Sequence, residues 1–117
     1  MFRRRDVLVP ERYQRLCAED QQVINALESC GADLAGERHV LHYVQVGSRE
    51  AAERAARLGG KWLTTVTDPG HPGEGWFVIY ERHDRVLTPV NVMADRELFE
   101  SMAEVHHGVY DGWEVSV

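Results

Sequence analysis

The sequence is poor in lysine, in cysteine and in long hydrophobic stretches, and each shortage excludes a class of protein. Lys61 is the single lysine of a 117-residue chain whose net charge is −6. Nucleic-acid binding relies on clustered Lys and Arg on the folded surface, so we do not expect nucleic acid as the direct ligand. No apolar run approaches the ~20 residues of a membrane-spanning helix, so we expect no membrane contact.

The two cysteines, Cys17 and Cys30, lie thirteen residues apart in one helical pattern. A helix rises 1.5 Å per residue, which separates them by about 20 Å, too far for a disulfide. Neither belongs to a CxxC or Cys/His spacing, so we expect no zinc site, no other metal and no cofactor. Two free thiols and the lack of a secretory signal predict a cytoplasmic protein.

Charge is unevenly distributed along the chain. Residues 1–15 carry five Arg against two acids, so residues 16–117 carry −9. The folded body is therefore predicted to be acidic. An Arg-rich protein segment matches such a surface better than a phosphate backbone does.

The length suits one domain, which we place at residues 10–117 after a short arm at residues 1–9. Apolar residues recurring at three and four predict a helix over about 11–30, which Gly31 ends. Alternation, caps and glycines predict the remaining elements. These are strands at 38–46, 61–66, 76–81 and 109–116, a helix after Ser48 with Ala51, Ala52, Ala55 and Leu58 facing inward, an irregular stretch at 82–91, and a helix ending before Gly108.

The order of these elements predicts an α+β fold, the ferredoxin-like βαββαβ sandwich, over about residues 38–117. Two strand-helix-strand units with right-handed crossovers interleave into a four-stranded antiparallel sheet of order 4-1-3-2. The first and third strands have two apolar faces, as central strands require. The additional helix at about 11–30 precedes this core, and we expect it to cover the otherwise open face of the sheet.

The closing strand contains an unusual tetrapeptide, Tyr110-Asp111-Gly112-Trp113. Period-two alternation places Trp113 on one face and Tyr110 on the other. Glycine inside a strand indicates a bulge or a close backbone approach. We therefore predict a local kink at the Asp-Gly pair that redirects Trp113.

These residues carry a resemblance to a known family. Tyr-Asp-Gly-Trp-Glu at 110–114, Leu-Glu-Ser-Cys-Gly-Ala-Asp at 27–33 and Ala-Ala-Arg-Leu-Gly at 55–59 resemble the ribonuclease E inhibitor B (RraB-type) family over about residues 27–115. The resemblance implies a small bacterial cytoplasmic domain of ferredoxin-like fold that docks on the non-catalytic region of ribonuclease E. This sequence departs from the best-known members of the family because it lacks a long acidic C-terminal tail and begins with an Arg-rich segment.

The last 24 residues contain six acids against Arg96, next to the aromatic strand. An acidic rim around aromatic residues is typical of a site that receives an Arg-rich peptide. The predicted partner is thus a protein, and the resemblance implies a ribonuclease with an Arg-rich segment. We predict that the partner-binding residues are Asp95, Glu97, Glu100, Glu104, Tyr110, Asp111, Trp113 and Glu114.

The six histidines do not form a predicted catalytic or metal site. His106 and His107 are adjacent at a helix end, and His39 and His42 point to opposite faces of a strand, so neither pair can chelate one ion. Histidine near a helix C-terminus suits a capping role. We expect no enzyme, but two alternatives remain: a dimeric small-molecule-sensing ferredoxin-like domain, and a hydrolase that uses His and Asp. The oligomeric state stays open.

Overall fold

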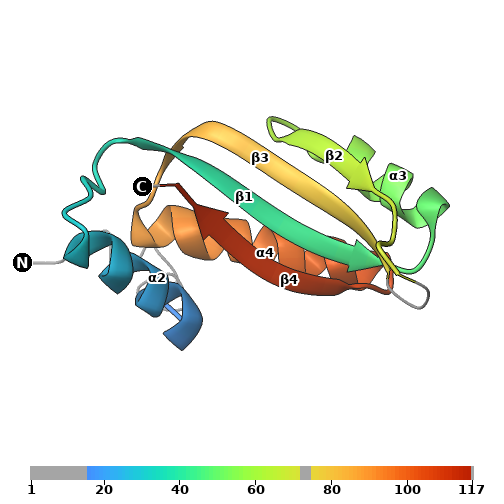
Figure 1. Ribbon diagram of the computed structural model, residues 1–117, viewed down its shortest axis with the longest axis horizontal. Helices are drawn as coiled ribbons and strands as arrows, with labels where there is room; N and C mark the ends of the chain where they lie inside the picture. Colours follow the sequence, from blue (N-terminus) through green and yellow to red (C-terminus); the bar gives the residue numbers. More distant parts are fainter. Residues whose placement is uncertain (1–15, 72–74, 117) are drawn as a thin grey trace, which may run out of the picture.

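A computed structural model describes residues 16–71 and 75–116 (Figure 1). Its elements are α2 (Ala18–Ser29), β1 (Glu37–Val46), α3 (Arg49–Arg57), β2 (Leu63–Thr67), β3 (Trp76–Val86), α4 (Pro89–Val105) and β4 (Val109–Val115). The predicted arm at 1–9 and the predicted helical residues before 16 lie outside these ranges. Among the described helices, none has both the length and the apolar character needed to cross a bilayer.

The four strands form one antiparallel sheet in the order β2-β3-β1-β4. This confirms the predicted α+β architecture and strand order. The central pair supplies much of the core, because Val44 of β1 and Val78 of β3 are fully buried. Helices α3 and α4 cover the face of the sheet toward which these valines point (Figure 1).

Helix α3 begins as predicted at Ser48, whose hydroxyl accepts a hydrogen bond of 3.1 Å from the backbone N–H of Ala51. Its small inward residues allow close approach to the sheet, and the Tyr80 hydroxyl donates to the carbonyl of Ala55 at 2.8 Å. Leu58 was predicted to face inward and is instead 59% exposed. The helix ends at Arg57, so Leu58 is its C-cap and leaves the buried face.

The stretch predicted to be irregular, residues 82–91, is mostly ordered secondary structure. Strand β3 continues to Val86 because Arg85 and Val86 pair with the start of β1, although their side chains lack apolar alternation. Helix α4 then begins at Pro89, and the Thr88 hydroxyl accepts a hydrogen bond of 3.1 Å from the backbone N–H of Asn91. The polar residues of this stretch show no apolar pattern in the sequence. The end of β3 and the start of α4 are instead stabilised by strand pairing and by helix capping.

Helix α2 does not cover the open face of the sheet, as the sequence had suggested. It lies beside α4 at the β4 edge of the sheet (Figure 1). Its Ile24 and Leu27 belong to the same hydrophobic core as the buried residues of the sheet, α3 and α4. The cause is Asp20, a buried carboxylate of α2 whose partners all lie on the helix side. The opposite sheet face remains partly exposed, with the side chains of Leu41, Tyr43, Phe77 and Ile79.

Candidate functional site

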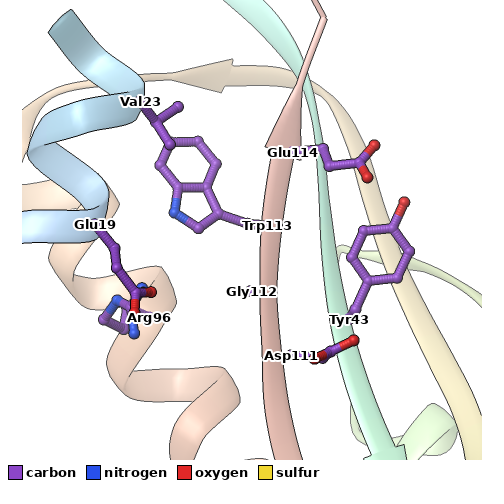
Figure 2. Close-up of a pocket in the computed structure, with 8 residues that line it drawn as sticks. All are labelled: Glu19, Val23, Tyr43, Arg96, Asp111, Gly112, Trp113 and Glu114. Atoms are coloured by element: carbon purple, nitrogen blue, oxygen red, sulfur yellow. The ribbon is translucent and has the colours of Figure 1, made fainter. Parts of the chain in front are cut away.

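A hollow lies at the edge of the sheet, where β4 runs between α2 and β1 (Figure 2). Trp113 points from β4 toward Val23 of α2, whereas Asp111 and Glu114 lie on the other side of the strand, near Tyr43. The hollow thus reaches around the edge of the sheet. Its lining comes from α2, β1, α4 and β4: Glu19, Val23, Tyr43, Arg96, Asp111, Gly112, Trp113 and Glu114.

A β-bulge at Asp111 and Gly112 shapes this edge. The register between β1 and β4 shifts by one residue between His42 and Val44, so two residues of β4 face Tyr43 alone. Gly112 has a φ of 94°, which residues with a side chain rarely adopt. The predicted bulge is therefore confirmed.

The bulge also corrects the predicted faces of the closing strand. The sequence placed Tyr110 and Trp113 on opposite faces, but the extra residue between them resets the alternation. Both rings face the helix side and lie against His42, with ring centroids 5.8 and 5.9 Å from it. The period-two argument failed because it assumed an uninterrupted strand.

Arg96 of α4 joins three elements at the floor of the hollow. Its Nε and Nη2 each donate to a carboxylate oxygen of Asp20 at 3.0 Å, and Nη2 also donates to Glu19 at 3.0 Å. Its Nη1 reaches Glu100 at 3.3 Å, and the guanidinium lies 5.1 Å from the ring centroid of Tyr110. The two-pronged bond to Asp20 fixes the guanidinium plane.

Asp20 is fully buried and connects this cation to the closing strand. Its Oδ1 also accepts a hydrogen bond of 2.8 Å from the indole N–H of Trp113. Burial tends to raise the pKa of Asp20, but the hydrogen bonds from Arg96 and Trp113 outweigh it and leave that pKa below its usual value. The same pairing raises the pKa of Arg96. The ion pair therefore stays charged at neutral pH and orients Trp113.

His42 lies behind the hollow, in the aromatic core. Its Nδ1 and the Tyr110 hydroxyl form a hydrogen bond of 2.8 Å, and its ring stacks on Phe99 at 4.5 Å. Burial lowers the pKa of His42 to about 3 and raises the pKa of Tyr110. Both side chains are therefore neutral at pH 7, and the pair contributes to the packing of the aromatic core.

The structure separates the eight residues predicted to bind a partner. Asp111, Trp113 and Glu114 line the hollow, whereas the Tyr110 ring packs against the hydrophobic core behind it. Asp95 is 5% exposed, and both its oxygens accept hydrogen bonds of 2.8 Å from Arg85. Burial nevertheless raises the pKa of Asp95.

The other three predicted residues lie on the outer side of α4. Glu100 and Glu104 are exposed, and Glu97 is partly exposed. Their spacing of three and four places them on one helix face. The Arg96–Glu100 contact connects this face to the hollow.

The sequence argument missed Glu19, Asp20, Arg96 and Tyr43. A signal existed for Asp20, since it falls four residues before Ile24 on the apolar stripe of α2. A carboxylate on a buried stripe requires a cationic or hydrogen-bonding partner. Its partner lies 76 residues away, a distance that the pattern within one helix does not bridge.

The histidines at the end of α4 act as predicted at one position. His106 Nδ1 donates to the carbonyl oxygen of Met102 at 2.8 Å, which satisfies a carbonyl of the last helical turn. His107 has a φ of 56° and leaves the helix there. This confirms the capping role of His106.

Comparison with known proteins identifies the family to which the chain belongs. No curated protein matches the chain. The model of the family described as Regulator of ribonuclease activity B, RraB, matches residues 17–115. That range includes α2, the whole sheet and both remaining helices, so it covers every residue that lines the hollow. The chain therefore belongs to the RraB family of regulators of ribonuclease activity.

Proposed function

We propose that this chain is a non-enzymatic regulator that binds a ribonuclease of the ribonuclease E type and changes its cleavage of RNA. Membership of a family of ribonuclease regulators is the observation that carries the proposal. Cys17 and Cys30 are both free and exposed, which supports a reducing, cytoplasmic setting. The contact is with the ribonuclease itself and does not involve direct binding of RNA.

The hollow at the β4 edge receives an arginine side chain of the partner. The carboxylates of Glu19, Asp111 and Glu114 border it, and the ring of Tyr43 lies beside Glu114 (Figure 2). A guanidinium binds carboxylates through two parallel hydrogen bonds and stacks on aromatic faces, so it suits this lining better than an ammonium does. The body of the chain is also acidic, because residues 16–117 carry eight Lys or Arg against seventeen Asp or Glu, a net charge of −9.

The outer face of α4 extends this contact beyond one arginine. Glu97, Glu100 and Glu104 follow one stripe, and Leu98 and Val105 beside them are 43% and 69% exposed. A partner segment with basic and apolar residues at helical spacing would cover both stripes. Arg96 already neutralises part of Glu19 and Glu100. Most of the attraction therefore comes from Glu104, Asp111 and Glu114.

The remaining predicted residues support this surface from within. Asp95 holds α4 to β3 through Arg85, and Tyr110 and Trp113 hold β4 to α4 and α2. In this proposal Asp95 and Tyr110 position the contact residues and do not themselves meet the partner, whereas Trp113 also lines the hollow that receives the arginine. Replacing Asp95 or Tyr110 changes binding only to the extent that it changes the fold.

Binding kinetics test the proposal. The non-catalytic, Arg-rich region of ribonuclease E from the same organism is immobilised, and the association rate is measured between 0.01 and 0.15 M salt. Attraction between exposed charges is screened as the Debye length falls from ~30 to ~8 Å, so the rate should drop steeply. Changing Glu97, Glu100 and Glu104 to Gln should flatten that dependence.

A matched variant separates local contact from total charge. Changing the exposed residues Glu28 and Glu37 to Gln and Asp68 to Asn removes the same charge elsewhere, and should leave most of the salt dependence in place. A second variant, Asp111→Asn with Glu114→Gln, should weaken binding by at least tenfold. Equal rates and salt slopes in all variants would place the contact outside this surface.

A further inference from the structure

We propose that His39, Glu81 and His83 form a binding site for one divalent ion of the zinc class. The three side chains offer two imidazole nitrogens and one carboxylate oxygen, and these ligand atoms all lie within 4.8 Å of one another. None of them lines the hollow at the β4 edge. The site is independent of the ribonuclease contact proposed above.

Strand pairing brings these residues together on the sheet face that carries no helix. Glu81 and His83 are two residues apart on β3 and point to the same side. The register between β1 and β3 shifts between Arg38 and Val40, which places His39 opposite the extra residue of β3. The sequence argument missed the cluster because His39 lies 42 residues from Glu81.

The distances suit a shared ion after small adjustments. The His83 Nε2 lies 3.6 Å from Glu81 Oε2, and His39 Nε2 contacts the same oxygen in a hydrogen bond. Two ligands bound tetrahedrally to one zinc ion at about 2.0 Å lie about 3.3 Å from each other. The separation of His83 and Glu81 therefore differs from that required by only a few tenths of an ångström.

Ser116 orients His39 for this role. Its hydroxyl lies 3.1 Å from His39 Nδ1, and its backbone N–H donates to the carbonyl of His39 at 3.0 Å. A histidine ligand commonly makes such a second hydrogen bond, which fixes the ring and directs the other nitrogen at the metal. Here the directed nitrogen is Nε2, which faces Glu81.

One rearrangement accompanies binding. The rings of His39 and His83 stack in parallel planes with centroids 4.1 Å apart, and lone pairs in parallel planes do not converge on one ion. The side chain of His83 is 64% exposed, so its ring can rotate out of the stack at little cost. His39 and Glu81 are about one-third exposed, which leaves the ion accessible to water at its remaining position.

The ligand set selects the class of ion. Two imidazoles and one carboxylate suit Zn²⁺, Co²⁺ or Ni²⁺, whereas Mg²⁺ and Ca²⁺ prefer oxygen ligands alone. Because the ligands come from β1 and β3, and Ser116 connects the end of β4, a bound ion would join three strands. We therefore expect the ion to raise the thermal stability of the folded chain.

Titration of the full-length protein, free of any affinity tag and treated with a chelator, tests the site. Calorimetry with ZnCl₂ should give one ion per chain, and Co²⁺ should produce visible absorption bands of a site with nitrogen ligands. His83 is the first residue to replace, because its side chain is exposed and its loss should disturb the fold least. His83→Gln and His39→Gln should each lower the affinity by at least tenfold and reduce the zinc-induced rise in Tm.

Two control variants remove histidines outside the cluster. His71→Gln and His107→Asn both change exposed residues, and each should bind zinc as the parent does. Absence of stoichiometric binding in the parent would overturn the proposal. Equal affinity in the parent, His39→Gln and His83→Gln would also overturn it, since zinc would then bind elsewhere on the chain.

Discussion

The glycine of the bulge permits a sharp test of how the β4 edge is built. Gly112 has a φ of 94°, and a Cβ added there would meet no atom within 4 Å. Replacing it with alanine therefore introduces no clash, and the cost comes from the backbone alone. The relevant change is Gly112→Ala, measured as a difference in the free energy of unfolding.

The expected loss follows from two opposing effects. A left-handed conformation costs an alanine about 1–2 kcal/mol, and a φ of 94° lies beyond the region that side chains tolerate best. Alanine also lowers the conformational entropy of the unfolded chain, which stabilises the folded state by about 0.4–1 kcal/mol. Because a φ of 94° places the backbone strain at the upper end of that range, Gly112→Ala should destabilise the protein by about 1 kcal/mol or more.

Chemical denaturation of two further glycine variants provides the reference. Gly60 has a φ of 60° and Gly47 no positive φ, and neither position has an atom within 4 Å of an added Cβ. Gly60→Ala should cost less than Gly112→Ala, and Gly47→Ala should be neutral or stabilising. A neutral or stabilising Gly112→Ala would refute the argument that the bulge requires glycine.

Three further predictions concern buried groups and the end of α4. Asp20→Asn leaves the charge of Arg96, whose side chain is 17% exposed, without its main partner, and should cost about 3 kcal/mol in urea denaturation; a loss below about 1 kcal/mol would contradict that role. His42 has a pKa of about 3 in the folded chain and the ordinary value of 6.5 in the unfolded chain. Only the unfolded chain gains this proton as the pH falls from 6.5 towards 3, so the folded chain loses stability across that range. The slope should be on the order of 1.4 kcal/mol per pH unit, and His42→Gln should flatten it. Changing His106 and His107 to Gln should leave regulation of the ribonuclease within a few-fold, and complete loss of activity at unchanged stability would favour a catalytic role.

Much of the fold was predictable because its signals are local. The Ser48 cap and the glycine after α2 depend on residues within one turn, and both occur as predicted. The alternation in β1 places Val40, His42 and Val44 on the buried face as expected. Two apolar faces on β1 and β3 identified the central strands without any knowledge of their partners.

The errors arose where distant residues decide the structure. Asp20 draws α2 to Arg96 and Trp113, so α2 lies beside α4 and leaves the other sheet face uncovered. Pairing with β1 extends β3 through polar residues up to Val86. Neither effect has a signal within the segment that it controls.

The candidate site was predictable in its composition but only partly in its geometry. The abundance of acids near the closing strand identified Asp111 and Glu114, which line the hollow. The same counting included Asp95, because charge along the sequence does not distinguish an exposed carboxylate from one buried against Arg85. Burial depends on helix phase and on the neighbouring strand, which composition does not contain.

Inhibition of the ribonuclease is the most direct test of the central claim. RNA cleavage by full-length ribonuclease E from the same organism is measured with increasing amounts of the purified protein, and again with an enzyme that lacks its Arg-rich, non-catalytic region. We predict that the parent protein slows cleavage by the full-length enzyme only, and that Asp111→Asn with Glu114→Gln weakens this effect by at least tenfold. Unchanged cleavage at saturating protein, or equal inhibition of the shortened enzyme, would contradict the account.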